Sequence, residues 1–217
     1  MKKILIILFS FSFSLEITTD FGTFFIDDVS IERPFLGGFN KPKIQWIDWD
    51  NDNDDDLFLL DEDGKIKYFE NNSYQDLGTM KYDFNLITTS FKDISNIYWF
   101  YFGDFDNDSD FDLITQDPEN LNGMLYYSNE LDDLVLIDNV FDSNSTLVYS
   151  DPLMVPTFAD IDNDNDLDFF SVNLIGTVSF YENMGLNDNK PVYNFITSDW
   201  EEISIVGEGR HGSNAIN

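Results

Sequence analysis

The sequence of 217 residues contains no cysteine and a single histidine, His211. The lack of cysteine excludes disulfide bonds, thiol catalysis and a lipid-anchored N-terminal cysteine. A Ser-His-Asp triad needs a histidine within the folded part of a protein, whereas His211 stands in a glycine-rich tail without a partner cluster. The P-loop and HExxH motifs are also missing. We therefore expect a protein that is not an enzyme.

Basic residues are scarce as well. Lys and Arg number 11 against 42 Asp and Glu, which gives a formal net charge of −31. Nucleic acids and anionic membranes are bound through basic patches, so we expect no nucleic-acid partner. Hydrophobic residues still make up 42% of the chain and include 22 Phe, which is ample material for a core and unlike a disordered chain.

Much of the acid is concentrated in three copies of one decapeptide, at residues 48–57, 104–113 and 160–169. The copies start 56 residues apart, and a fixed period of this size is typical of an array of similar structural units. Each copy has Asp at positions 1, 3, 5, 7 and 9, namely Asp48, Asp50, Asp52, Asp54 and Asp56; Asp104, Asp106, Asp108, Asp110 and Asp112; and Asp160, Asp162, Asp164, Asp166 and Asp168.

So many carboxylates within nine residues repel one another unless a hard cation neutralises them, and Ca²⁺ prefers such oxygen ligands. The side chains at positions 1, 3, 5 and 9 can converge on one ion, together with the backbone carbonyl of position 7. Position 6 must turn sharply, and position 2 is apolar, so that it can anchor the loop to a core. Position 6 is Asn53, Ser109 and Asn165 in the three copies, and position 2 is Trp49, Phe105 and Ile161.

Two alternatives compete with this interpretation. An EF-hand needs a Glu at position 12 and a helix on each side, but position 12 is Leu59, Thr115 or Ser171, and the flanks lack a helical period. An acidic, solvated turn that binds nothing explains a single copy, but it does not explain three copies in register with apolar anchors.

The pattern Asp-apolar-Asp-Asn-Asp-x-Asp-x-Asp, followed by a Tyr/Phe-rich strand that ends in Asn, resembles the FG-GAP/VCBS-type repeat over about residues 21–217. The resemblance implies blades of a Ca²⁺-binding β-propeller, as in the head of integrin alpha subunits and in many bacterial surface proteins. It also implies about one Ca²⁺ per acidic loop. One departure is the absence of Gly at position 6.

The flanks of the loops predict an all-β fold of four-stranded antiparallel sheets, one for each repeat. A first strand precedes each loop, a second follows it, a turn leads to a third, and a less regular outer strand completes the unit. The expected strands are 44–47, 57–60, 65–70 and 82–87; 98–103, 113–116, 124–128 and 134–137; and 155–159, 169–172, 177–182 and 192–196.

Residues 1–15 have the pattern of a signal peptide, with Lys2 and Lys3 before an apolar run of about 12 residues that is too short for a bilayer span of roughly 20. We therefore expect export, no membrane insertion after cleavage, and repeats over 16–217. Aligning Phe195 with Phe25, which precedes Asp48 by 23 residues, places the next loop at position 218. This predicts a C-terminally truncated piece of an incomplete propeller.

Two classes of function fit the sequence. The first, which we favour, is a secreted or surface-exposed module for binding or adhesion, in which Ca²⁺ rigidifies the blades and loops contact an extracellular protein or glycan. The second is the propeller domain of an extracellular polysaccharide-degrading enzyme. Aromatic pairs such as Tyr68-Phe69 and Tyr126-Tyr127 recur at one place in each repeat, which favours packing between blades over sugar stacking.

Overall fold

The computed structural model describes residues 24–26, 29–31, 38–131, 133–151 and 154–204. The chain divides into two units, Met1–Gly38 and Phe39–Asn217. In the first unit, β1 (Phe24–Ile26) and β2 (Val29–Ile31) pair as an antiparallel hairpin. The expected signal peptide and the glycine-rich end of the tail lie outside the described residues.

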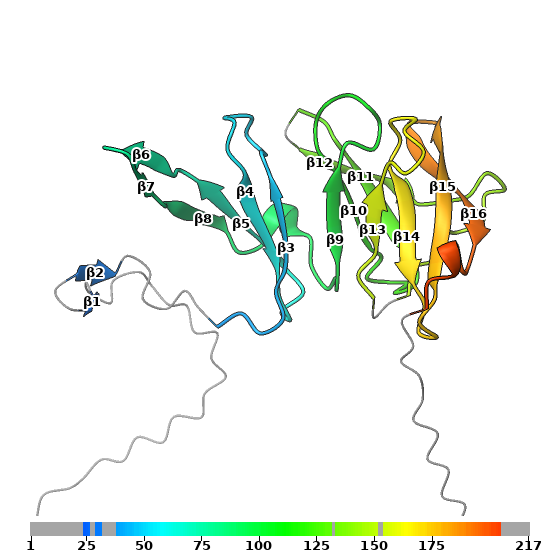
Figure 1. The fold of residues 1–217 in the computed structure, drawn as a ribbon, viewed down its shortest axis with the longest axis horizontal. Coiled ribbons are helices and arrows are strands. Elements are labelled where there is room, and N and C mark those ends of the chain that lie inside the picture. The colour runs from blue at the N-terminus through cyan, green and yellow to red at the C-terminus, as the bar shows by residue number, and fades with distance from the viewer. Residues whose placement is uncertain (1–23, 27–28, 32–37, 132, 152–153, 205–217) are drawn as a thin grey trace, which may run out of the picture. The chain divides into compact units, whose positions relative to one another are not determined.

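The second unit contains three four-stranded antiparallel sheets that follow one another along the chain, which confirms the predicted all-β, blade-like fold (Figure 1). The first sheet consists of β3 (Lys43–Ile47), β4 (Asp56–Leu60), β5 (Ile66–Asn71) and β8 (Phe84–Thr88). The second consists of β9 (Phe100–Gly103), β10 (Asp112–Gln116), β11 (Met124–Asn129) and β12 (Leu134–Asn139). The third consists of β13 (Thr157–Ala159), β14 (Asp168–Val172), β15 (Val178–Asn187) and β16 (Lys190–Thr197).

The three sheets share one register around the acidic loop. The Asp at position 9 pairs with the residue just before position 1, as Ile47 with Asp56, Gly103 with Asp112 and Ala159 with Asp168. Each second strand therefore begins one residue earlier than the sequence predicts. The Asp belongs to the ladder through its backbone, even though its side chain faces the loop.

Two apolar clusters fill the space between successive sheets. The first joins the first and second sheets through Phe58, Phe91 and Phe102, and the second joins the second and third sheets through Phe105 and Phe158. Rings of both clusters meet edge to face or tilted, which adds to the stabilisation from burial. Four members of the recurrent aromatic pairs lie within or beside these clusters, in line with the packing role expected for the pairs, namely Tyr68, Tyr126, Tyr127 and Tyr181.

One polar contact between sheets is repeated by different side chains. The Gln45 amide donates to the Phe102 carbonyl over 2.6 Å and accepts from the Phe102 N–H over 2.8 Å. At the equivalent place in the next sheet, the Tyr101 hydroxyl donates to the Phe158 carbonyl over 3.1 Å. The contact between neighbouring sheets thus recurs at the same place, although the residues that make the contact differ.

Three smaller elements were not predicted. The hairpin of β6 (Tyr74–Asp76) and β7 (Thr79–Lys81) is exposed throughout, so it lacks the alternation of buried and exposed residues that predicts a strand. The 3₁₀ turns η1 (Phe91–Asp93) and η2 (Trp200–Glu202) follow the first and third sheets, and each has two residues with positive φ. Within the described residues, none of the helices has the length and apolar character needed to cross a membrane.

Candidate metal sites

Each acidic decapeptide connects the first strand of a sheet to the second. The three connections, here called the first, second and third loops, lie at the same edge of their sheets, at the top of Figure 1. They follow β3, β9 and β13 and end in β4, β10 and β14. The flanking strands are paired up to the residue on either side of the loop, so the loop is held at both ends by a ladder.

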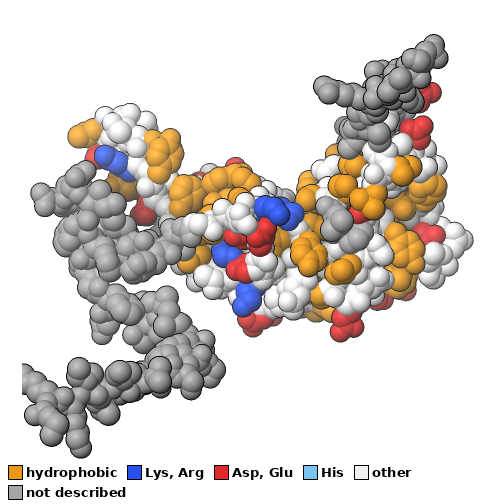
Figure 2. All heavy atoms as spheres, turned by 90° about the horizontal axis from the view of Figure 1, so that it is seen from below, with side chains coloured by type: hydrophobic (Ala, Val, Ile, Leu, Met, Phe, Trp, Pro, Cys, Tyr) orange, Lys and Arg blue, Asp and Glu red, His pale blue; other side chains and the backbone are white. Residues whose placement is uncertain are grey.

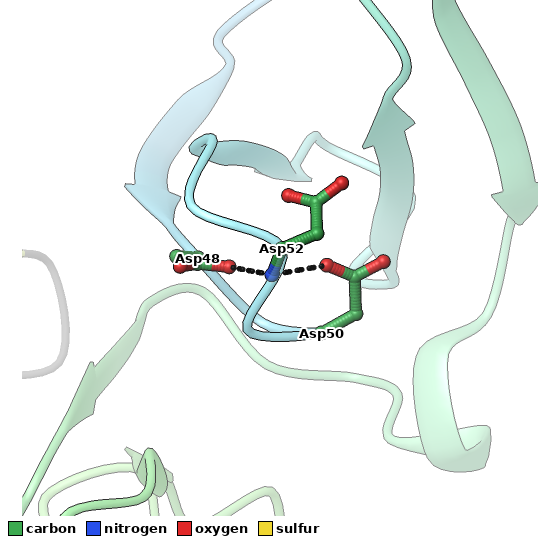
Figure 3. A group of neighbouring side chains, drawn as sticks. All are labelled: Asp48, Asp50 and Asp52. Carbon is green, nitrogen blue, oxygen red and sulfur yellow. Dashed lines mark hydrogen bonds between the residues drawn. The ribbon is translucent and has the colours of Figure 1, made fainter.

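In the first loop the chain winds around the side chain of Asp48. The Asp52 N–H donates to Asp48 Oδ1 over 3.0 Å and lies 3.3 Å from Asp50 Oδ1, and the Asn53 N–H donates to Asp48 Oδ2 over 3.1 Å (Figure 3). One carboxylate oxygen from each of Asp48, Asp50 and Asp52 lies within 4.8 Å of the others. This spacing is suited to three ligands of one cation.

Three hydrogen bonds are common to all three loops. In each, the N–H groups of positions 5 and 6 donate to the two oxygens of position 1, and the N–H of position 7 donates to the carboxylate of position 5. The clusters of three carboxylates are equally compact, with one oxygen per residue within 4.8 Å, and consist of Asp104, Asp106 and Asp108, and of Asp160, Asp162 and Asp164.

Two positions of each loop have the left-handed backbone conformation. Position 6 has φ of 75° at Asn53, 77° at Ser109 and 73° at Asn165, so Ser takes the conformation that the sequence required of it. Position 4 is Asn in every loop and also has positive φ, between 61° and 65°. Asn is enriched in this region, and its recurrence at position 4 is the pattern that would have revealed the second turn.

The Asp at position 9 has a different environment from those at positions 1, 3 and 5. Asp56, Asp112 and Asp168 are at most 1% exposed. One oxygen of each accepts the N–H of position 2 over 3.1–3.3 Å, and the other accepts the N–H of an Asn in the third strand over 2.8–2.9 Å. In the first two sheets a Tyr hydroxyl, of Tyr68 or Tyr126, donates a third bond.

The Asn that recurs in each third strand holds the end of the loop by two hydrogen bonds. Asn71, Asn129 and Asn183 each donate their backbone N–H to position 9, and their side-chain amide donates to the carbonyl of position 8 over 3.0–3.4 Å. This explains why Asn recurs at this place in every third strand, as the last residue of β5 and β11 and within β15. Position 9 thereby connects both ends of the loop to the sheet. That its carboxylate and the carbonyl of position 7 bind the metal directly stays a prediction.

Burial and mutual repulsion raise the pKa of several loop carboxyls. Burial is the main cause at Asp112, where it raises the pKa to about 7, and it also raises the pKa of Asp56 and Asp168. At Asp110 burial, followed by the negative charge of Asp108, raises the pKa to about 6. A cation among these groups would reverse the effect, because it offsets both the desolvation and the repulsion of the charged forms.

Some buried carboxylate oxygens of the loops accept no hydrogen bond, and they show whether the residues are suited to a cation. Oδ1 of Asp106, a member of the second cluster, is buried and accepts no hydrogen bond, and the same holds for Oδ1 of Asp54 and Asp110 at position 7. A buried carboxylate oxygen without a partner is costly, and a bound cation would supply the missing partner. The donor set consists of oxygens alone, which fits Ca²⁺.

The apolar anchors at position 2 behave differently in the three loops. Trp49 packs edge-on against Phe58, Phe91 and Phe102, and Phe105 is 2% exposed. Ile161, however, is 51% exposed, so the expectation that it anchors its loop to a core is wrong. Position 2 packs toward the sheet that follows, and the described residues contain no fourth sheet beyond the third.

A pocket of about 290 Å³ lies away from the loops, between β12 and the hairpin of β15 and β16. Its lining includes Asp138, Asp142 and Asp188. Lys190 forms an ion pair with Asp138 over 2.8 Å, and these carboxylates do not form one of the three-ligand groups found among the described residues. The pocket is therefore not a candidate metal site.

Comparison with known proteins adds no further assignment, since no family model, curated protein or solved structure matches the chain.

Proposed function

We propose that each of the three loops binds one Ca²⁺ and that the chain is a secreted or surface-exposed β-propeller repeat module without catalytic activity, which binds an extracellular protein or glycan. The observation that carries the calcium sites is the buried, donor-free Oδ1 of Asp106 inside a three-carboxylate cluster whose geometry is repeated twice. One such cluster is common on acidic surfaces, whereas three with the same bonds indicate a built site.

Calcium suits these loops better than other metals. The ligands are hard oxygens, and each loop offers up to three clustered side chains, with the carbonyl of position 7 and the carboxylate of position 9 nearby. Ca²⁺ accepts six to eight oxygens in flexible geometry, whereas Mg²⁺ demands a nearly ideal octahedron, and Zn²⁺ favours nitrogen and sulfur. The proposed export is consistent with calcium binding, since loops of modest affinity stay occupied at extracellular calcium concentrations.

The propeller arrangement is supported by the outward faces of the first and third sheets. On β3 of the first sheet, Ile44 is 55% and Trp46 is 46% exposed. On the third sheet, Phe170, Phe180 and Trp200 pack against one another at the side away from the second sheet. In a propeller, each of these apolar faces would pack against a further blade, as the facing sides of the three sheets do here.

Calorimetric titration of the metal-free chain with Ca²⁺ tests the proposal, with the single variants Asp52→Ala and Asp55→Ala compared in parallel. Both remove one carboxylate from the first loop, but Asp52 belongs to the cluster, whereas the side chain of Asp55 is exposed at position 8. We expect three sites in the natural chain and in Asp55→Ala, and two in Asp52→Ala. Absence of binding heat, or equal stoichiometry in the two variants, would refute the proposal.

A further inference from the structure

The second and third loops are joined by a hydrogen bond between their side chains. Asn107 Nδ2 donates to Asp166 Oδ1 over 2.8 Å, across a separation of 59 residues in the sequence. Asn107 is position 4 of the second loop and lies between the cluster members Asp106 and Asp108. Asp166 is position 7 of the third loop, where the backbone carbonyl is the expected ligand and the side chain is free for another contact.

A close apolar contact supports this bond. Leu167, which follows Asp166, packs against the cluster between the second and third sheets. A Cβ atom at Gly103, which precedes the second loop, would lie only 2.7 Å from Leu167 Cδ1. Gly103 thus leaves room for the Leu167 side chain, which would have to move if a larger residue stood there. The two loops are fixed to each other by an adjacent polar and an adjacent apolar contact.

The first and second loops lack the equivalent bond. The residues at the matching positions are Asn51 and Asp110, and within the described residues the Asp110 Oδ1 is buried without a hydrogen bond. Only the apolar half of the contact is present there, since Phe111 packs against the first cluster. The connection between neighbouring loops is therefore specific to the second and third.

From this difference we propose that the second and third sites bind Ca²⁺ cooperatively, with Asn107 as the positioning residue, while the first site binds independently. This inference rests on the proposed calcium sites. A cation held by Asp106 and Asp108 fixes Asn107 between them. Asn107 then holds Asp166, whose N–H donates to the cluster member Asp164 over 3.0 Å. Ordering one loop thus lowers the entropic cost of ordering the other, and the effect is reciprocal.

The experiment is carried out in the Asp52→Ala variant of the full chain, in which only the second and third sites are expected to bind. Asn107→Asp removes the donor but keeps a residue that tolerates φ of 63°. Asn163→Asp is the matched control, because it makes the same change at position 4 of the third loop, and among the described residues the Asn163 side chain makes no hydrogen bond to another loop. The double variant N107D/D166N restores a donor and an acceptor with their places exchanged.

Titration with Ca²⁺ alone is followed by calorimetry. We expect one cooperative step for two ions in the Asp52→Ala background and in its N163D derivative. In N107D we expect two separate steps and an affinity of the third site that is about tenfold weaker, within the usual range of coupling between sites. The exchanged pair should recover the cooperative step, which excludes misfolding as the cause.

Two outcomes would overturn the inference, and they can be told apart. If calcium binds but N107D and N163D give the same two-site curve, the loops are not coupled through Asn107, and the calcium sites themselves stand. If the natural chain takes up no calcium, the proposed function fails and the coupling fails with it.

Discussion

The second loop and its two neighbours have the same motif but very different surroundings. The second loop has apolar partners on both sides, since Phe105 is buried and Phe111 packs against the first cluster. In the first loop, position 8 is the exposed Asp55, and in the third, position 2 is the exposed Ile161. Each loop is thus a connector that reaches toward the preceding sheet with position 8 and toward the following sheet with position 2.

The comparison shows that burial of the acidic residues depends on the neighbouring sheets as well as on the motif. Asp112, in the middle loop, has its pKa raised to about 7, chiefly by burial. It also lies beside Asp106 and Asp110, each of which has a buried oxygen without a donor. Without a cation, the middle loop therefore carries the largest electrostatic cost, and a cation should stabilise it most.

Removal of calcium should have the largest effect on stability. Binding to the folded state alone stabilises by about 2.7 kcal/mol per site at a hundredfold excess over the dissociation constant, so three sites contribute on the order of 8 kcal/mol. That is comparable to the total stability of a typical domain. We expect a chelator to lower the melting temperature markedly, as measured by circular dichroism. Identical melting with and without chelator would contradict this expectation.

Site-specific hydrogen exchange would sharpen the comparison between the loops. On chelation, we expect the amides of Asp108 and Ser109 to lose more protection than those of Asp52 and Asn53, because the second loop has the most buried carboxylates. The amides of Asn53 and Ser109 are the matched pair of probes, because each donates to Oδ2 of position 1 over 3.1 Å. Equal loss of protection in both loops would mean that burial by neighbouring sheets does not matter.

Substitution of the position 2 anchor should separate the middle loop from the last. Phe105→Ala leaves a cavity between the second and third sheets, and buried Phe→Ala changes cost about 3–5 kcal/mol. Ile161→Ala removes a side chain that is 51% exposed, and we expect a cost of about 0.5 kcal/mol. Denaturant unfolding in saturating Ca²⁺ measures both. Similar costs would show that Ile161 has a packing partner after all.

Much of this fold could be predicted from the sequence because its determinants are local and repeated. The 56-residue period and the apolar strands located the three sheets and the strands on either side of each loop. The β6–β7 hairpin was missed because its exposed residues have no core to pattern them. The exposure of Ile161 was missed because position 2 packs against another sheet, and a local motif contains no information about its neighbours.

The candidate site was predictable in part for the same reason. The spacing of Asp at positions 1, 3 and 5 is a local property, and the structure brings these carboxylates together. The contacts of position 9 depend on residues 15–17 positions further along the chain, such as Asn71 and Asn129, and they emerge only when the third strand folds back. The bond from Asn107 to Asp166 spans two sheets and has no counterpart between the first two loops, so repetition could not reveal it.

The buried Asp at position 9 offers a smaller test of the same comparison. Asp112 accepts three hydrogen bonds, from Phe105, Asn129 and Tyr126, whereas Asp168 accepts two, because Phe180 replaces the Tyr. We expect Asp112→Ala to be more destabilising than Asp168→Ala by about 2 kcal/mol, the value of one bond to a charged group. Both variants remove the residue at position 9, and denaturant unfolding of the metal-free chain compares them without any contribution from calcium. An equal cost would contradict the prediction.

Tyr126→Phe isolates that third bond and should have the smallest effect. The Tyr126 hydroxyl is buried and donates to Asp112 Oδ2 over 3.1 Å, so its removal should cost about 1.5 kcal/mol and lower the melting temperature by roughly 3–6 °C. Tyr127→Phe is the control, since neighbouring residues of a strand point to opposite faces and no hydrogen bond of its hydroxyl occurs among the described residues. Phe180 at the equivalent place in the third sheet shows that the fold accepts a ring without a hydroxyl there. A cost no larger than that of the control would mean that the hydroxyl contributes nothing to holding Asp112, and that burial alone distinguishes the middle loop.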